Sequence, residues 1–258
     1  MSMSAELVEA LEAATALPRL LVASDFDGVL ATFVQDPADA RPQEGTMATL
    51  LALADLPGTT TAVVSGRDLD TLTALTGLDP AGPVNRIGSH GAQTSRAGAT
   101  FALSAAQSER LEAVGATLAR IARAHPATRL EHKPAAIVLH TRGLSDEDAA
   151  AAEADAMAAV ERLPGVAVLH GKAVIECSVV LADKGTALRE LATEVGADSI
   201  VYLGDDRTDE DAFEAMTESE VSIKVGPGQT LAHHRIDGPL LVPEVLDLVL
   251  ALRRATPS

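Results

Sequence analysis

The sequence contains very few aromatic residues. They make up 2% of its 258 residues, with no tryptophan and one tyrosine. Proteins that bind single-stranded nucleic acid stack the bases on aromatic side chains, so this class of function is disfavoured. The formal net charge of −17 points the same way, because a nucleic-acid backbone or an anionic membrane would be repelled. An anionic substrate would need a local basic pocket or a metal ion.

Cysteine and long apolar runs are also scarce. Cys177 is the single cysteine, so no internal disulfide can form and a reducing cytoplasm is expected. Residues 1–20 are acidic and lack the basic start and apolar stretch of a signal peptide. No run approaches the roughly 20 apolar residues of a membrane span. We therefore expect a cytoplasmic protein with no nucleic-acid, membrane or obligate protein partner.

What the sequence does contain is a regular alternation of two patterns. Short apolar runs, such as 20–27, 59–66, 199–206 and 221–226, are separated by helical patterns. This alternation predicts an α/β fold with a parallel sheet covered on both faces. The runs are almost continuously apolar, as burial on both faces requires.

The middle of the chain has a different rhythm. Helical patterns at 105–125 and 145–163 alternate with strand patterns at 128–142, read as one strand or a hairpin, and at 166–179, read as two strands. We interpret this part as an inserted α+β cap domain. The expected boundaries are 1–97 and 183–258 for the two parts of the core, and 98–182 for the cap.

Acidic residues stand directly after two of the apolar runs. The segment LLVASDFDGVLATF, residues 20–33, leads straight into Asp25 and Asp27, and a later run ends at Asp205 and Asp206. In open parallel sheets, ligands bind beyond the carboxyl ends of the strands. Asp25 and Asp27 are two residues apart, so on an extended backbone both side chains should point the same way. Such carboxylates repel one another, and Mg²⁺, which prefers hard oxygen ligands, would relieve the repulsion.

A metal held by carboxylates favours phosphate chemistry. One carboxylate can attack phosphorus and form an aspartyl phosphate, while another acts as general acid and then general base. The phosphate oxygens also need donors, which we expect from Ser65, Gly66, Arg67 and Lys184, all at predicted element boundaries. Each cluster taken singly is also typical of a helix N-cap or an Asx turn. Their occurrence together and in this order favours a functional site.

Four motifs in this order resemble those of the haloacid dehalogenase-like phosphatases. They are DFDGVL, SGR, Lys184 and GDDRTDEDAF, and the insertion between the second and third is typical of members with a C2-type cap. The segments DFDGVLATFVQDPADARP, IGSHGAQ and LEHKPAAIVLHTR resemble the trehalose-6-phosphate phosphatases in particular. The resemblance covers most of the chain from about Leu20, and it implies a Rossmann-like parallel-sheet core with an inserted α+β cap.

The resemblance also implies roles for the matched residues. Asp25 would be the nucleophile and a Mg²⁺ ligand, and Asp27 the acid and base that reaches the metal through its backbone carbonyl. Asp205 would be the third protein ligand, with Asp206 and Asp209 beside the ligands. The phosphoryl group would be held by Ser65, Gly66, Arg67 and Lys184.

On the inserted unit, the resemblance implies sugar-binding roles for Glu131, Lys133, Arg142, Lys172 and Glu176. Glu131 and Lys133 are two residues apart on one expected strand, and Lys172 and Glu176 are four apart on another, so each pair shares a face. Spacing alone fits surface ion pairs, which stabilise a sheet little.

The resemblance implies that the segment GSHGAQ, residues 88–93, lies near the ligand where core and cap meet. His90 and Gln93 are therefore further substrate-binding candidates, although His90 alone is typical of a packed turn. Gln93 stands where the resembling proteins usually carry glutamate, so the hydrogen bonding is kept and a charge is removed.

Together these features predict a Mg²⁺-dependent phosphatase that hydrolyses trehalose 6-phosphate through an aspartyl phosphate. Its partner would be the small-molecule sugar phosphate. Three alternatives stay open: hydrolysis of a sucrose, mannosylglycerate or pseudo-disaccharide phosphate, a phosphomutase, and a non-catalytic sugar-phosphate sensor. The presence of both Asp25 and Asp27 disfavours the sensor.

Overall fold

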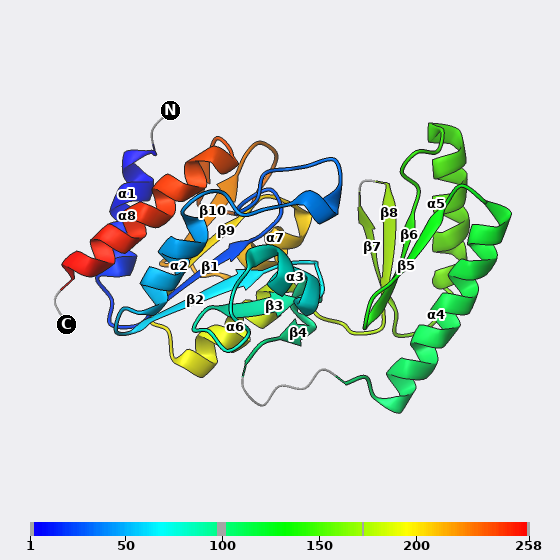
Figure 1. Ribbon diagram of the computed structural model, residues 1–258, viewed down its shortest axis with the longest axis horizontal. Coiled ribbons are helices and arrows are strands. Elements are labelled where there is room, and N and C mark those ends of the chain that lie inside the picture. Colours follow the sequence, from blue (N-terminus) through cyan, green and yellow to red (C-terminus); the bar gives the residue numbers. More distant parts are fainter. Residues whose placement is uncertain (1–2, 97–101, 172, 257–258) are drawn as a thin grey trace. The chain divides into compact units, whose positions relative to one another are not determined.

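The computed structural model describes residues 3–96, 102–171 and 173–256. The chain divides into two compact units, Met1–Ala99 with Ala182–Ser258, and Thr100–Leu181 (Figure 1). We call these the core unit and the cap unit. The expected start of the inserted domain, residue 98, lies outside the described residues.

A seven-stranded sheet runs through the core unit in the order β11–β10–β9–β1–β2–β3–β4. All neighbouring strands are parallel except β3 and β4. The chain moves from β1 outward to β2 and β3, and later returns to the other side of β1 with β9. The strand order therefore reverses beside β1, which is where open α/β sheets bind ligands. The strands are β1 (Leu20–Asp25), β2 (Thr59–Val64), β3 (Asn85–Gly88), β4 (Gln93–Thr94), β9 (Ser199–Gly204), β10 (Val221–Val225) and β11 (His234–Ile236).

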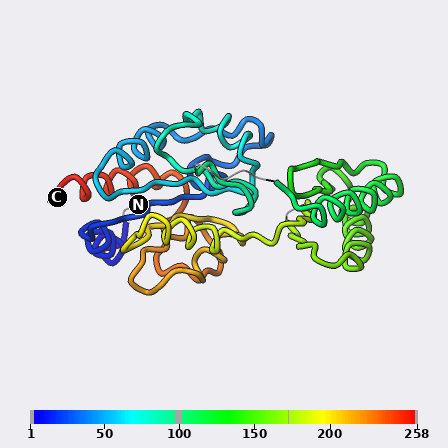
Figure 2. The backbone as a smooth tube through the Cα atoms, turned by 90° about the horizontal axis from the view of Figure 1, so that it is seen from below, coloured from blue at the N-terminus to red at the C-terminus, as the bar shows by residue number. Residues whose placement is uncertain are grey.

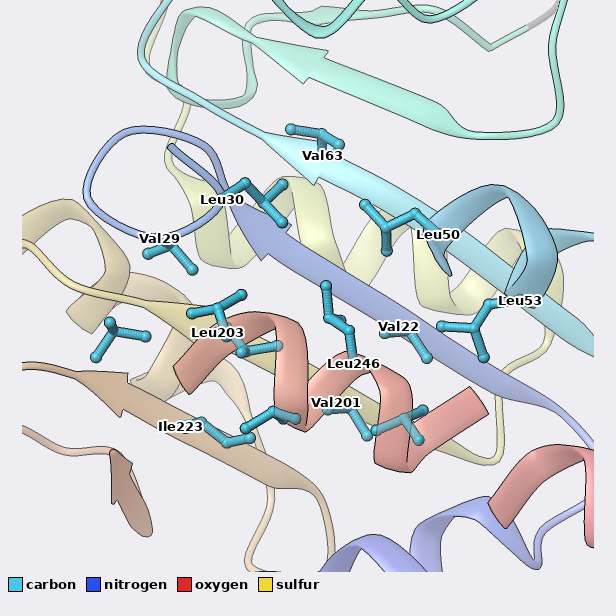
Figure 3. Close-up of a cluster of buried hydrophobic side chains, with 14 of the residues drawn as sticks. Val22, Val29, Leu30, Leu50, Leu53, Val63, Val201, Leu203, Ile223 and Leu246 are labelled. Atoms are coloured by element: carbon cyan, nitrogen blue, oxygen red, sulfur yellow. The ribbon is translucent and has the colours of Figure 1, made fainter. Parts of the chain in front are cut away.

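Helices cover both faces of this sheet because successive strand residues point to opposite faces. On β1, Leu20 and Val22 pack in the cluster that contains residues of α1, α2, α3 and α8, whereas Leu21 and Ala23 pack with α6 and α7. Figure 3 shows Val22 of β1 among side chains of the first cluster. The helices are α1 (Ala5–Thr15), α2 (Thr46–Ala54), α3 (Leu69–Thr76), α6 (Lys184–Val195), α7 (Arg207–Ala215) and α8 (Val242–Ala255).

The two segments of the core unit interleave. The last helix, α8, contacts α1 and α2 of the first segment, and its red trace can be followed beside them in Figure 2. Arg253 of α8 strengthens this connection, because its guanidinium donates hydrogen bonds to the backbone oxygens of Thr15 and Pro18 at 2.8 and 2.6 Å. The sheet therefore depends on residues from both sides of the insertion.

The cap unit is a four-stranded antiparallel sheet with two helices on one face. The strand order is β5–β6–β8–β7, and Ile137, Leu139 and Ile175 pack with residues of α4 and α5. The expected strand or hairpin at 128–142 is a hairpin. The elements are α4 (Ala105–Ala124), β5 (Arg129–His132), β6 (Ala136–His140), α5 (Asp146–Val160), β7 (Ala167–Gly171) and β8 (Val174–Ser178).

Two helices that border the acidic cluster begin at aspartate N-caps. Asp183 caps α6 and Asp206 caps α7, each by accepting backbone hydrogen bonds from the first turn. Both helices start just beyond the sheet, so capping fixes where Lys184 and Asp209 lie. Of the helices in the described part of the chain, none is long and apolar enough to cross a lipid bilayer.

Candidate active site

The carboxyl end of β1 sets the position of Asp25, which is its last residue and 4% exposed. Beyond it the chain turns sharply, since the amide of Gly28 donates to the Ala31 oxygen and the amide of Ala31 donates to the Phe26 oxygen, both at 2.8 Å. Gly28 has φ +80°, and a Cβ there would lie 2.3 Å from Oδ2 of Asp205. Glycine is therefore needed both for the turn and for the approach of Asp205.

Asp27 has different side-chain partners from Asp25. The Arg67 guanidinium donates from Nε to Oδ2 of Asp27 at 2.7 Å and from Nη2 to Oδ1 at 2.6 Å. Arg67 also lies over the Phe26 ring, 5.6 Å from its centroid. β1 ends at Asp25, so the alternation of an extended strand does not continue to Asp27. Arg67 instead determines how the Asp27 carboxylate is oriented.

Lys184 places a positive charge between two buried carboxylates. It is the first residue of α6 and 2% exposed. Its Nζ lies 3.0 Å from Oδ1 of Asp25 and 2.8 Å from Oδ1 of Asp209. Burial alone would lower the pKa of Lys184, but the charges of Asp209 and Asp25 outweigh burial and raise it. The ammonium group therefore stays charged next to Asp25.

Asp209 fixes the turn between β9 and α7. It is fully buried, and its Oδ1 also accepts a hydrogen bond from the Tyr202 hydroxyl at 2.7 Å. Its Oδ2 accepts the backbone amides of Asp205 and Asp206 at 2.8 and 3.0 Å. With Lys184 included, four donors surround this one carboxylate, so Asp209 holds both the lysine and the acidic turn in place.

The arrangement of carboxylates is suited to a hard metal ion. One oxygen each from Asp25, Asp205 and Asp209 lie within 4.8 Å of one another. Burial, followed by the charges of Asp209 and Asp206, raises the pKa of Asp205 to about 7. Burial also raises the pKa of Asp25 well above its usual range, although Lys184 opposes this. Within the described residues Oδ1 of Asp205 is buried and has no hydrogen-bond partner. These oxygens fit Mg²⁺.

Asp206 has a structural role as well as a place beside the cluster. Its Oδ1 accepts hydrogen bonds from the amide and hydroxyl of Thr208, at 2.8 and 2.7 Å. It also lies 3.9 Å from Nζ of Lys184. Burial would raise the pKa of Asp206, but Lys184 and the Thr208 hydrogen bonds together lower it. The N-cap interpretation is thus correct for this residue, and it leaves Asp206 charged near Lys184.

The cluster after β2 is a tightly packed turn. Ser65 is buried, and its Oγ accepts the backbone amide of Arg67 at 3.2 Å. The backbone amide of His90 donates to the backbone oxygen of Ser65 at 3.0 Å. A Cβ on Gly66 would lie 2.3 Å from the His90 ring. Position 66 must therefore be glycine for His90 to pack here. The turn brings Ser65, Gly66 and His90 together, as the sequence order alone could not show.

Gln93 connects this turn to α3. Its side chain is nearly buried, and Oε1 accepts the Leu69 amide at 3.0 Å and the Ser89 hydroxyl at 2.9 Å. Ser89 and His90 both have positive φ, so this turn needs tertiary contacts to hold it. A glutamate oxygen would accept the same two hydrogen bonds. The glutamine at this position therefore preserves the local geometry.

Sequence reasoning missed two buried residues that hold the acidic turn. Tyr202 supports Asp209, as described above. Lys224 of β10 is also buried, and its ammonium group donates to the backbone oxygen of Asp205 and lies 3.6 Å from Oε1 of Glu210. Lys224 pairs in register with Gly204 of β9. A lysine within the apolar run VSIKV could have indicated a buried charge. Which group Lys224 contacts depends on the strand order, which the sequence does not show.

In the cap unit, charged side chains pair across the strands. Nζ of Lys133 lies 2.6 Å from Oε2 of Glu176, and Nε2 of His140 lies 2.7 Å from Oε2 of Glu131. Val138 of β6 is in register with both Glu131 and Glu176, so the two glutamates flank it on one face. The structure thus brings Glu131, Lys133 and Glu176 together and adds His140.

The two remaining sugar-binding candidates are placed differently. Arg142 is exposed and follows β6, whose last residue is His140. Glu176 lies on β8, which begins at Val174. Lys172 itself lies outside the described residues.

With this geometry established, the chain can be compared with known proteins. The sequence profile described as trehalose-phosphatase matches residues 23–240, which is most of the chain and includes every core candidate discussed above. The chain belongs to the trehalose-phosphatase family. The family resemblance predicted from the sequence is thereby confirmed.

Individual members of the trehalose-phosphatase family agree with this assignment. A trehalose-phosphate phosphatase of Mycobacterium marinum is 34% identical over 93% of the chain, which spans 65% of that protein. A bifunctional trehalose-6-phosphate synthase/phosphatase of Thermoproteus tenax is 33% identical over 84% of the chain, which spans 30% of that protein. The chain is thus shorter than these relatives.

The fold is shared with a solved member of the same family. The C-terminal domain of a C. albicans trehalose-6-phosphate phosphatase matches with a TM-score of 0.80 and 24% identity, covering 98% of this chain and 99% of that domain. This likeness, together with similarity to a haloacid dehalogenase-like hydrolase structure, confirms the predicted fold class.

Proposed function

We propose that this protein is a Mg²⁺-dependent phosphatase that hydrolyses trehalose 6-phosphate to trehalose and phosphate. The observation that carries the proposal is the buried Asp25 at the end of β1, with Lys184 3.0 Å away and an oxygen-rich cluster beside it. Membership of the trehalose-phosphatase family supports the choice of substrate. The buried free Cys177 is compatible with a reducing cytoplasm, where we propose the protein acts.

Asp25 and Asp205 would hold the Mg²⁺, with the backbone oxygen of Asp27 as a third ligand. When bound, Mg²⁺ would offset the mutual repulsion of the carboxylates and the charge of the phosphate oxygens. Asp209 is better suited to positioning than to coordination, because donors already occupy both of its oxygens.

Catalysis would proceed in two displacement steps at phosphorus. An oxygen of Asp25 forms a bond to phosphorus as the bond to the sugar oxygen breaks, and Asp27 gives its proton to that leaving oxygen. Asp27 then takes a proton from a water molecule, whose oxygen attacks phosphorus and releases phosphate and free Asp25. The hydrogen bonds from Arg67 orient Asp27 for both transfers.

Lys184 and the turn after β2 would stabilise the transferring group. The ammonium group of Lys184 is already beside Asp25, so its positive charge lies where negative charge develops on the phosphoryl oxygens. Ser65 and the amide of Gly66 would donate hydrogen bonds to the same oxygens. Because Lys184 and Ser65 are buried and fixed before substrate arrives, little reorganisation is needed in the transition state.

The cap unit would supply the contacts to the sugar. Glu131, Lys133 and Glu176 gather on one face of its sheet, and Arg142 follows β6. Lys172 is kept as a further candidate from the sequence. Carboxylates and ammonium groups are good partners for sugar hydroxyls. The Glu131–His140 contact on this face can be exchanged for contacts with substrate at small cost, since partly exposed pairs contribute little stability. The Lys133–Glu176 pair is more buried, with side chains 14% and 11% exposed.

Phosphate release from a panel of esters tests the proposal. The panel contains trehalose 6-phosphate, sucrose 6-phosphate and glucose 6-phosphate, each with Mg²⁺ and with EDTA. Asp25→Asn is assayed beside Asp55→Asn, a matched control at an exposed aspartate that follows α2 and precedes β2. We expect metal-dependent turnover that favours trehalose 6-phosphate, lost in Asp25→Asn and kept in Asp55→Asn.

Other outcomes would point to the alternatives. Metal-dependent turnover of a different ester would keep the core chemistry and change the substrate. Transfer of phosphate to another position of the sugar, without release, would indicate a mutase. No turnover of any ester would contradict the proposed activity and favour a sensor.

A further inference from the structure

Phe33 differs from the other aromatic residues that the structure describes. Phe26, Tyr202 and Phe213 are buried in the core unit, whereas Phe33 is 76% exposed. Each of the residues from 32 to 39 is exposed as well, so the Phe33 ring lies on an open stretch of chain. A single exposed apolar residue is ordinarily unremarkable. The position of this one is what matters.

The tip of the Phe33 ring rests against the turn that follows Asp25. A Cβ built on Gly28 would lie 2.7 Å from Cζ of Phe33 and 2.3 Å from Oδ2 of Asp205. Both atoms therefore approach the same point, and the edge of the ring lies beside the Asp205 carboxylate. An aromatic ring that is open to solvent thus borders the acidic cluster.

The chemistry of a sugar phosphate gives this ring a partner. In a phosphate monoester only one oxygen separates phosphorus from the carbon of the alcohol, so a sugar whose phosphate is at Asp25 must begin close to this turn. The faces of a pyranose ring carry C–H groups, and these pack favourably on the electron-rich face of an aromatic ring. Apolar and aromatic surface beside a few polar groups is typical of small-molecule sites.

We propose that Phe33 is a specificity residue whose ring packs against the sugar ring that carries the phosphate. This inference rests on the proposed function, because it requires a sugar phosphate ester at Asp25. The core unit would then contact the sugar as well as the phosphate. The ring would favour sugar esters over esters of small acyclic alcohols.

The test compares four proteins: the wild type, Phe33→Ala, Phe33→Tyr and Leu17→Ala. Phe33→Tyr keeps the ring. Leu17→Ala removes an exposed apolar side chain just before β1, at the end of the strand opposite to Asp25. For each protein we would measure KM and kcat for trehalose 6-phosphate, the inhibition constant of inorganic phosphate, and the melting temperature. Inorganic phosphate reports on the phosphate site without any sugar.

We expect KM for trehalose 6-phosphate to rise about 3- to 10-fold in Phe33→Ala, the size of an aromatic packing contact. The inhibition constant of phosphate and the melting temperature should match the wild type, since Phe33 is exposed. Phe33→Tyr and Leu17→Ala should keep the wild-type KM.

An unchanged KM in Phe33→Ala would overturn the inference. An equal rise in KM and in the inhibition constant of phosphate would also overturn it, because the loss would then not involve the sugar. Failure of the proposed function is a separate result, seen as absence of wild-type turnover on every sugar phosphate. When the wild type is active, the changes in KM and in the inhibition constant of phosphate between wild type and Phe33→Ala decide the inference.

Discussion

The Lys184–Asp209 pair of the core unit and the Glu131–His140 pair of the cap unit differ in how far their side chains are buried. In the core unit, Lys184 and Asp209 are almost completely buried, and backbone amides and a tyrosine hydroxyl hold the carboxylate in one orientation. In the cap unit, the Glu131 side chain is 41% exposed and its partner His140 is 21% exposed. Buried, fully bonded charges are costly to disturb, whereas partly exposed pairs are not.

This difference suits a division of labour. Phosphoryl transfer needs groups that are fixed before the substrate arrives, because charges that are already oriented stabilise the transition state most. Recognition of a sugar needs groups that can exchange one partner for another. Substitutions of the buried charges in the core unit should therefore affect turnover and stability together, whereas substitutions on the cap face should affect mainly KM.

The largest effect is expected for Lys184→Met. It leaves Asp25 and Asp209 buried without their cation, so the free energy of unfolding should fall by about 3–5 kcal/mol. Turnover should also be lost. Urea unfolding in EDTA and phosphate release would measure the two effects. Arg254→Met removes an exposed cation of α8 and is the matched control. An unchanged free energy of unfolding in Lys184→Met would contradict the view that Lys184 stabilises the buried carboxylates of the core unit.

A moderate effect confined to binding is expected for Glu176→Gln. It weakens the 2.6 Å contact with Lys133 and removes a proposed sugar contact. We expect KM for trehalose 6-phosphate to rise about tenfold, the loss of one good charged hydrogen bond. The inhibition constant of inorganic phosphate should stay the same. Glu147→Gln, on the exposed first turn of α5, is the control. If kcat falls and KM does not change, the proposed division between the units is wrong.

The smallest effect is expected for Gln93→Glu. Both hydrogen bonds of Gln93 use an acceptor oxygen, which glutamate also offers. We expect KM and kcat within about twofold of the wild-type values and a melting temperature within about one degree of the wild type. Substitutions that keep their contacts usually have such small effects. A tenfold change in KM would show that charge at this position selects the substrate.

The sequence predicted the elements of the core unit well because burial on both faces of a parallel sheet produces recognisable apolar runs. The runs at 20–27 and 199–206 became β1 and β9, and the polar residues after them lie in one cluster. The short edge strands β4 and β11 were not predicted, since two or three residues carry no clear periodicity. The helix α1 was seen only as an acidic, amphipathic segment.

Pairings between side chains were predicted less well because they depend on strand order and on where each strand ends. Asp27 pairs with Arg67 because the extended backbone stops at Asp25. Lys133, just beyond the end of β5, pairs with Glu176 of β8, and β6 lies between these two strands. Lys224 meets the Asp205 carbonyl because β10 is next to β9. Spacing along the sequence contains none of this information.

The most direct test of the proposed mechanism is covalent labelling of Asp25. Enzyme would be mixed with trehalose 6-phosphate carrying radioactive phosphorus, quenched in acid within milliseconds, digested, and the peptides examined for label. We predict label on the peptide that contains Asp25, released by hydroxylamine as an acyl phosphate, and no label in Asp25→Asn. Full turnover by Asp25→Asn, or turnover of the wild type with label on another residue, would contradict the account.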